Sequence, residues 1–297
     1  MKLAAIDIGS NAARLLITEV VENEKGIPLF NKLNLIRVPL RLGFDVFETG
    51  TISKEKVNRI VETIKAYKHL LNIYEVKHLK ACATSAMRDA SNAQDILRKV
   101  KLETGIEIKI ISGDEEASYI YENHVAENLE TGHTYLYIDV GGGSTELTFF
   151  SNGKLSFKES FNIGTIRLLK NQVSENQWDE MKSYIKQRTK GYADIIAIGS
   201  GGNINKVFSI SKRKEGKPLQ LELLKDYLKE FSSFSLQERM LLYKLREDRA
   251  DVLVPALQIY VNVMRWAGAN EIFVPKIGLA DGLVHLLYDE IKRNAKF

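Results

Sequence analysis

The sequence predicts an α/β protein made of two similar halves, and a repeated motif is the main reason. The segment Tyr137–Leu147, YIDVGGGSTEL, joins a strand-like run, an Asp, three glycines and a second apolar run. The segment Ala4–Ile17, AAIDIGSNAARLLI, has the same order of residue types. Their Asp residues stand 139 − 7 = 132 positions apart in a chain of 297, so the repeat divides the sequence into near-halves. We therefore expect duplicated domains, each placing one such hairpin at a central cleft.

The three glycines of the second motif favour an anion site. Residues 141–143 carry no side chains, so their backbone N–H groups can close around a phosphate. Ser144 and Thr145 add hydroxyl donors, and Asp139 stands where a carboxylate can hold Mg²⁺, directly or through water. A glycine-rich hairpin also forms simply because a turn requires positive φ. The repeat at the N-terminus favours phosphate binding over that alternative.

Composition and charge limit the class of protein. A chain with 44% hydrophobic and 27% charged residues is globular, and its length suits about two domains. No run of 18 apolar residues and no secretory leader is present, so we expect a soluble cytoplasmic protein without a membrane partner. The single cysteine, Cys82, lies in an apolar run and is expected to be a buried thiol. A net charge of +4 does not demand nucleic acid but permits a polyanionic small substrate.

Hydrophobic periodicity and turn residues predict the remaining elements. Strands are expected at 35–43, 78–83, 106–111, 134–140, 145–150, 154–162, 194–198 and 271–274. Helices are expected at 53–74, 165–171, 174–190, 221–233, 235–245 and 283–293, and from residues 93, 112 and 249 onward. The glycine loop at 199–206 is expected to open another helix. Pro39 makes the first of these strands an edge strand, because proline cannot donate to a ladder.

The predicted domain boundary lies in ordinary structure, because no low-complexity linker is present. We expect a first domain at 1–125 and a second at 126–297, with a hinge near 126–133. The last helix, about 283–297, is a candidate to pack back onto the first domain. A turn is expected at 276–282.

Three other segments hold candidate ligand or catalytic residues. Arg88 follows a strand, where its planar guanidinium can hold two phosphate oxygens or pair with Asp89. Gly201 and Gly202 open a helix, and helix N-termini suit phosphates. The segment Ser112–Ala117 places three acids at a helix start, where they either complement the macrodipole or supply a general base.

Basic residues elsewhere have both a functional and a structural interpretation. Arg37 and Arg41 near the edge strand are either anion ligands or solvated arginines. The turn Ser211–Lys217 is either a solvated charge run or a collector of a long polyanion. Arg249 and Asp251, at the start of an apolar helix, are candidates for a place in the cleft or between the domains.

These motifs together resemble the exopolyphosphatase/guanosine-pentaphosphate phosphohydrolase family. The matching segments, in order along nearly the whole chain, are IDIGSNAARLLI (6–17), LRLG (40–43), ATSAMRDASN (83–92), ISGDEEA (111–117), YIDVGGGSTEL (137–147), IGSGGNINK (198–206), RADVLVPA (249–256) and GLADGL (278–283). Where many members have Thr, this chain has Asn203, and Ala280–Asp281 replaces a common Arg-Glu.

The resemblance implies an actin-like fold of two RNase H-like α/β domains in the ASKHA superfamily. It implies hydrolysis of a terminal phosphoryl group with Mg²⁺, a possible stimulation by K⁺, and a homodimer. In the motifs, Glu116 matches the catalytic glutamate, while Asp139 and Glu146 match carboxylates that organise metal and water. Asp7 of the N-terminal motif is a further metal candidate, and Glu115 is expected to be structural.

Phosphate binding is assigned in the same way. The matching positions are Ser10, Asn11, Arg88, Gly141, Gly142, Gly143, Ser144 and Thr145, to which the third glycine loop adds Gly201 and Gly202.

The expected substrate is inorganic polyphosphate, from which the protein would release orthophosphate. The alternative within the same chemistry is removal of the 5′ phosphate of guanosine pentaphosphate (pppGpp). A kinase of the same fold would need an acceptor pocket, and the SGDEEA segment argues against it. A nucleotide sensor or an actin-like assembly protein would bind without turnover, which the acidic set Glu116, Asp139 and Glu146 disfavours.

Overall fold

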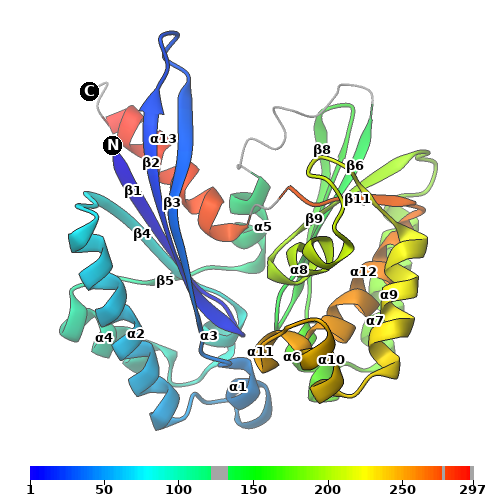
Figure 1. The fold of residues 1–297 in the computed structure, drawn as a ribbon, viewed down its shortest axis with the longest axis horizontal. Helices are drawn as coiled ribbons and strands as arrows, with labels where there is room; N and C mark the ends of the chain where they lie inside the picture. Colours follow the sequence, from blue (N-terminus) through cyan, green and yellow to red (C-terminus); the bar gives the residue numbers. More distant parts are fainter. Residues whose placement is uncertain (122–132, 276–277, 295–297) are drawn as a thin grey trace. The chain divides into compact units, whose positions relative to one another are not determined.

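The computed structural model describes residues 1–121, 133–275 and 278–294 (Figure 1). By its internal contacts the chain forms two units, residues 1–123 with 279–297 and residues 124–278. The hinge predicted near 126–133 lies, apart from residue 133, outside the described residues.

The first unit is built on a five-stranded sheet in the order β3-β2-β1-β4-β5. Its strands are β1 (Lys2–Ile8), β2 (Ala12–Glu22), β3 (Pro28–Pro39), β4 (His78–Ala83) and β5 (Lys109–Ile110). Its helices are α1 (Gly43–Thr49), α2 (Lys54–Ile73), α3 (Ser85–Asp89), α4 (Ala93–Thr104), α5 (Gly113–Tyr121) and α13 (Leu279–Asn294). β1 is antiparallel to β2 and parallel to β4, so the sheet is mixed.

Helices cover both faces of this sheet because β1 and β2 are buried on both sides. Leu3 of β1 belongs to a core cluster with Leu283 of α13, and Cys82 of β4 lies in the same cluster. Along β1, Ala4 and Ile6 point to the face opposite that of Leu3, and they are also fully buried. The Cys82 thiol is therefore buried, as predicted, and burial raises its pKa, with a further contribution from the Asp7 and Glu116 carboxylates.

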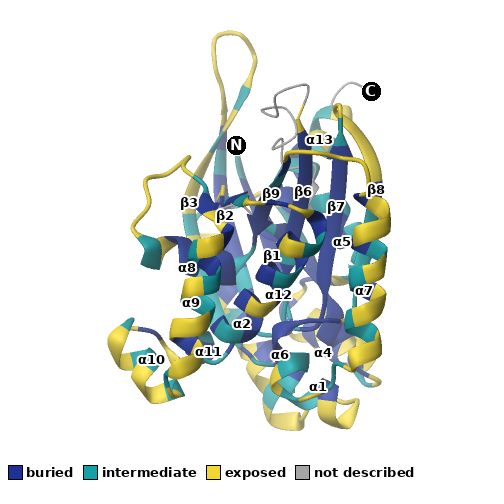
Figure 2. Ribbon diagram, turned by 90° about the vertical axis from the view of Figure 1, so that its right-hand side faces the viewer, coloured by how far each residue is buried: buried dark blue, intermediate teal, exposed yellow. Residues whose placement is uncertain are grey.

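The second unit is built on a six-stranded sheet in the order β10-β11-β9-β6-β7-β8. Its strands are β6 (Thr134–Val140), β7 (Thr145–Ser151), β8 (Lys154–Phe161), β9 (Ile195–Ser200), β10 (Leu219–Gln220) and β11 (Glu271–Phe273). Its helices are α6 (Thr165–Leu169), α7 (Glu175–Arg188), α8 (Gly202–Ser211), α9 (Leu221–Ser233), α10 (Leu236–Leu242), α11 (Glu247–Ala250) and α12 (Leu253–Ala267). In Figure 2 the strands β6, β7 and β9 are dark blue, which marks the buried centre of this sheet.

The two sheets repeat one topology. In the first, β3, β2 and β1 are antiparallel neighbours, and β4 and β5 continue in parallel. In the second, β8, β7 and β6 are antiparallel neighbours, and β9 and β11 continue in parallel. The chain is thus an α/β protein of two units with a duplicated mixed sheet, as the repeated motif predicts.

Most predicted elements agree with the structure to within a few residues, and four differ. The strand predicted at 35–43 is part of β3, which runs from Pro28 to Pro39, and Gly43 already begins α1. The strand predicted at 106–111 forms a ladder only at 109–110. Ile106 and Ile108 are buried, which explains their apolar pattern, but they lie before the paired residues. The helix predicted from 249 is broken into α11 and α12. Pro255 lies in the first turn of α12, and its ring would clash with the carbonyl of the residue four positions earlier. The turn predicted at 276–282 is wrong from residue 279 on, where α13 begins.

No helix among the described residues has both the length and the apolar character needed to cross a bilayer.

Candidate functional site

The turn between β6 and β7 is held by the helix that follows β8. The N–H of Gly141 donates to the carbonyl of Ser144 over 2.9 Å and closes the turn. The start of α6 donates to the carbonyls of the three glycines. These bonds are Thr165 N to Gly141 O at 3.0 Å, Ile166 N to Gly142 O at 2.8 Å and Arg167 Nε to Gly143 O at 2.8 Å. In a trans peptide the C=O and the N–H point in opposite directions, so the N–H groups of residues 142–144 point away from α6. This orientation is the one that an anion-binding nest requires.

Close packing beneath the turn fixes that orientation further. A Cβ at Gly164 would lie 2.5 Å from backbone atoms of Gly142 and Gly143, so only glycine fits there. Thr145 is fully buried, and its hydroxyl donates to the carbonyl of Ile163 over 2.6 Å. This contact ties β7 to the segment before α6. The predicted phosphate contacts of Ser144 and Thr145 stay predictions.

Two predicted carboxylates meet at the base of the same turn. Asp139 on β6 and Glu146 on β7 are directly opposite in the antiparallel ladder, and an oxygen of each lies within 4.8 Å of the other. Glu146 is buried, and the hydroxyl of Ser160 donates to its Oε1 over 2.9 Å. Like charges this close favour a cation between them, and carboxylate oxygens are the ligands that Mg²⁺ takes. The donor set therefore fits the predicted metal.

The third glycine loop packs against Asp139. Gly201 follows β9 with φ of +93°, and a Cβ there would lie 2.6 Å from Asp139 Oδ1. The side-chain amide of Asn203 donates to the carbonyl of Val140 over 3.4 Å. The loop that starts α8 is thus joined to the end of β6, and the structure brings Gly201 and Gly202 to the same place as the β6–β7 turn. Asn203 here has an identifiable structural contact.

Two residues of this site are missing from the predicted ligand set. A Cβ at Gly202 would lie 2.5 Å from Arg249 Nη1, so the guanidinium of Arg249 rests on the N-terminal turn of α8. Tyr260 of α12 is buried and donates to the carbonyl of Ser200 over 2.8 Å. Burial raises the Tyr260 pKa well above its ordinary value, and the Asp139 carboxylate raises it further. The only sequence signal for Tyr260 is its hydroxyl within an apolar helix.

In the first unit, the β1–β2 turn has the same backbone but a different charge. The N–H of Gly9 donates to the carbonyl of Ala12 over 3.0 Å, as Gly141 does to Ser144. Asp7 is buried and forms an ion pair with Arg14, with 2.6 Å between Oδ2 and Nη1. The role of Asp7 as a metal ligand stays a prediction.

The predicted ligands Ser10 and Asn11 are joined to neighbouring loops. The hydroxyls of Ser10 and Ser85 share a hydrogen bond of 2.7 Å. The carbonyl of Asn11 accepts from the N–H of Arg41 over 2.9 Å. The segments 9–11, 40–43 and 84–88 therefore meet at the end of β1.

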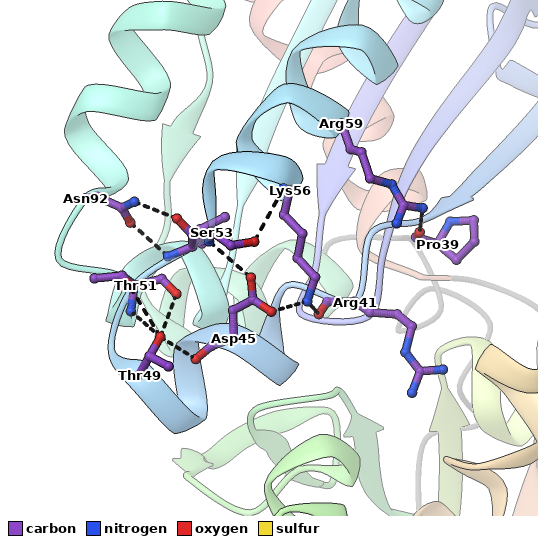
Figure 3. A network of polar contacts seen from close by, with 10 residues as sticks. Pro39, Arg41, Asp45, Thr49, Thr51, Ser53, Lys56, Arg59 and Asn92 are labelled. Carbon is purple, nitrogen blue, oxygen red and sulfur yellow. Dashed lines mark hydrogen bonds and ion pairs between the residues drawn. The ribbon is translucent and has the colours of Figure 1, made fainter.

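Arg41 is held by a polar network in which its side chain takes no part in the drawn bonds (Figure 3). Its backbone has φ of +53°, and its carbonyl accepts from Lys56 Nζ over 2.7 Å. Lys56 also pairs with Asp45, which accepts from the N–H of Ser53 over 3.0 Å. The guanidinium points away from the network and lies 4.0 Å from the centre of the Phe44 ring. The fixed backbone thus holds the Arg41 guanidinium beside the β1–β2 turn.

The start of α5 separates the two adjacent glutamates. Ser112 and Glu115 exchange side-chain to backbone hydrogen bonds of 3.1 Å and 3.0 Å, the reciprocal pattern of a capping box. Glu115 also pairs with Lys109 at 2.6 Å, and this bond together with that from Ser112 lowers the Glu115 pKa. Glu116 is buried instead. Glu115 therefore has a structural role, and Glu116 is the one buried in the protein.

Arg88 supports the same segment. Its Nη1 donates over 3.0 Å to the carbonyl of Ile111, the residue that precedes the α5 cap. The structure thus gives Arg88 a backbone partner, and its contact with phosphate stays a prediction.

The comparisons with known proteins agree on one family. A family model, described as the Ppx/GppA phosphatase family, matches residues 19–292. A bifunctional 3-dehydroquinate synthase/phosphatase of Fusobacterium nucleatum is 28% identical over 91% of this chain and 44% of its own length. A guanosine-5′-triphosphate,3′-diphosphate pyrophosphatase of Vibrio parahaemolyticus is 24% identical over 98% of this chain and 60% of its own length. The chain thus spans about half the length of these curated relatives.

A solved structure matches over nearly its whole length. The crystal structure of an exopolyphosphatase from Cytophaga hutchinsonii aligns with a TM-score of 0.82 at 25% identity, and the match covers 98% of each chain.

Proposed function

Because the chain belongs to the Ppx/GppA phosphatase family, we propose that it is an exopolyphosphatase, which hydrolyses the terminal phosphoryl group of inorganic polyphosphate with Mg²⁺ and releases orthophosphate. The observation that carries this proposal is the placement of two carboxylates, Asp139 and Glu146, at the base of a turn whose N–H groups are oriented for an anion. The likeness to the Cytophaga exopolyphosphatase over nearly all of both chains supports polyphosphate as the substrate.

Phosphoryl transfer to water needs charge neutralisation, a positioned water and a proton acceptor. Bound Mg²⁺ supplies positive charge next to the phosphate oxygens. In our proposal Asp139 and Glu146 hold that ion, and the N–H groups of residues 142–144 bind the phosphoryl oxygens. Arg88 and Arg249 contribute positive charge, and Glu116 orients the water and accepts its proton.

The direct test is phosphate release with Mg²⁺ from long-chain polyphosphate, tripolyphosphate and pppGpp, measured in parallel. We expect turnover of the two polyphosphates to exceed that of pppGpp, and Glu116→Ala to abolish it. Faster release from pppGpp would overturn the assignment of polyphosphate as the substrate. No release from any of the three, with nucleotide still bound, would overturn the catalytic assignment in favour of a sensor.

The metal has a test of its own. Asp139→Asn should raise the Mg²⁺ concentration for half-maximal activity at least about tenfold, because one of two carboxylate ligands is lost. The control Asp194→Asn makes the same change at an exposed residue with φ of +51°, which Asn also tolerates. It should leave the requirement unchanged. An equal Mg²⁺ dependence in both variants would contradict the metal site.

pppGpp hydrolysis is the second candidate, and the Vibrio relative named for that chemistry favours it. Further parts of the proposal are that each unit is one actin-like domain, that K⁺ stimulates turnover, and that the protein is a homodimer. The single buried Cys82 suits the reducing cytoplasm, where we place the protein.

A further inference from the structure

Helix α8 begins at the glycine loop and ends at the basic turn. Gly202, its first residue, contacts Arg249 and follows the residue packed on Asp139. Ser211 is its last residue, and the exposed basic run 212–217 follows directly. Ten residues of α-helix span about 15 Å. The helix therefore connects the proposed phosphate loop to a cluster of positive charge at a fixed distance.

One face of α8 is polar and partly exposed to solvent. The buried residues Asn203, Ile204, Val207 and Phe208 lie on one side of the helix. At 100° per residue, Asn205, Lys206 and Ser209 project from the opposite side, in line with Gly202. None of these three is fully buried. The turn 212–217 follows the last residue of the helix directly.

This face carries one positive charge within the helix and several more just beyond its end. Helix α8 contains no Asp or Glu, and Lys206 lies one turn from its start. Exposed Lys212 and Arg213 come next, followed by Lys214 and Lys217, with Glu215 as the one acid of the turn. Lys212 has φ of +54°, so the backbone leaves the helix sharply at this point and places the basic side chains at its end.

Linear polyphosphate matches such a surface in charge and in length. It carries a negative charge on every internal phosphate and has no shape or sequence to be read, so basic side chains in a row are sufficient to bind it. A tripolyphosphate held at the glycine loop ends well short of residue 212. A long chain reaches it.

We propose that Lys206, Ser209, Lys212 and Arg213 form a track along α8 that binds the distal part of a long polyphosphate chain whose end is held at the glycine loop. The inference rests on the proposed function, since it takes polyphosphate as the substrate. The track makes the enzyme prefer long chains over tripolyphosphate. Its contribution should be measurable as a higher kcat/KM for long chains and as a dependence of that kcat/KM on salt concentration.

The test reverses the two charges at the end of the track. The variant is Lys212→Glu with Arg213→Glu, and the matched control is Lys186→Glu with Lys190→Glu, two exposed basic residues near the end of α7. Both variants change the net charge equally. In the track variant we expect kcat/KM for long-chain polyphosphate to fall about tenfold more than kcat/KM for tripolyphosphate, and its salt dependence to weaken. The control should retain the wild-type ratio.

Equal losses on the two substrates, or equal effects of the two variants, would overturn the track. A milder pair, Lys212→Gln with Arg213→Gln, covers the case in which charge reversal prevents folding, and unfolding curves monitor this. A second readout separates the track from the proposed function. Binding of dye-labelled long-chain polyphosphate, followed by fluorescence anisotropy at low salt, requires no turnover. If wild type binds this probe without releasing phosphate, and only the track variant loses binding, the proposed hydrolysis is wrong and the track is supported. If wild type and the track variant bind the probe equally well, the track is overturned.

Discussion

Arg14 lies directly opposite Asp7 in the β1–β2 ladder and donates from Nη1 to its Oδ2 over 2.6 Å. The corresponding pair in the second unit is Asp139 and Glu146, two residues that also stand seven positions apart and face each other across a ladder. The two units thus share the first carboxylate and differ in the residue opposite it. One unit has a neutralised acid at this position, and the other has two acids that favour a cation.

Removing the Arg14 charge should destabilise the first unit. Arg14→Met leaves the buried Asp7 carboxylate without its ion pair and should lower the free energy of unfolding by about 2 kcal/mol, the scale of a lost bond to a buried charge. The control Arg98→Met breaks an exposed pair with Asp95 and should cost less than about 0.5 kcal/mol. Urea titrations measure both. A smaller loss for Arg14→Met than for Arg98→Met would contradict the structural importance of this pair.

The adjacent glutamates of α5 should separate activity from stability. Glu116→Gln removes the proposed proton acceptor and should reduce kcat by about 10³-fold without a large change in unfolding. Glu115→Gln keeps a capping side chain and loses the charge that pairs with Lys109, so it should cost at most about 1 kcal/mol and leave kcat within about twofold. Steady-state phosphate release and thermal unfolding distinguish the two. The reverse pattern would exchange their roles.

Two glycines with similar backbones test the contact with Asp139. Gly201→Ala and Gly191→Ala both place a Cβ at positive φ, +93° and +88°, so each should cost about 1 kcal/mol. Only at position 201 would the Cβ lie 2.6 Å from the Asp139 carboxylate, whereas nothing lies within 4 Å of a Cβ at 191. We expect Gly201→Ala alone to displace Asp139, to lower kcat at least about tenfold and to raise the Mg²⁺ requirement. Similar kinetics in both variants would show that Asp139 does not depend on this packing.

The network beneath Arg41 should make part of the stability depend on pH. Burial by itself would raise the pKa of Asp45, but hydrogen bonds from Lys56 and Ser53 outweigh it and lower that pKa. A lowered pKa in the folded state gives stability that is fully present above the unfolded pKa, near 4, and that is lost as the pH falls through the folded value.

The comparison of wild type with Asp45→Asn isolates this contribution. The difference in unfolding free energy should be on the order of 1 kcal/mol at pH 7 and should shrink below about pH 4. Denaturant unfolding at pH 7, 5 and 3 provides the measurement. A difference that grows on acidification would mean that Asp45 is not held as an anion.

The fold and the role of Glu115 could be predicted from the sequence because both depend on short, local sequence patterns. The repeat of strand, Asp, glycine and strand predicts that β1–β2 and β6–β7 are equivalent, and the structure confirms it in the shared strand order. The Ser112–Glu115 spacing is a readable capping box, so the structural role of Glu115 was also accessible. The start of α13 could not be predicted from the sequence. Glycines near 278–282 suggest a turn, but Ala280 and Gly282 are buried against the first sheet, and tertiary packing outweighs local preference.

The contacts of Arg249, which the sequence offers only as a cleft candidate, and of Tyr260, which it does not predict, join residues far apart in the sequence. Arg249 reaches Gly202 from 47 positions away, and Tyr260 reaches Ser200 from 60. Both come from the helices of the second unit's core, whose pattern reports only which side is buried. Periodicity places α12 against the sheet without saying which of its residues meets the end of β9. Such pairings depend on how the helix crosses the sheet, which a single sequence does not encode locally.

The hold of α6 on the β6–β7 turn has a thermodynamic meaning. With its carbonyls bonded and Gly164 packed beneath it, the turn loses its conformational freedom when the protein folds, not when an anion arrives. None of the binding energy from a phosphate is then spent on ordering this turn. A turn this stiff also cannot reshape itself for another ligand. Discrimination between a nucleotide and an inorganic chain must therefore come from surfaces further along the substrate, where evolution can vary residues without disturbing the group that holds the reacting phosphate.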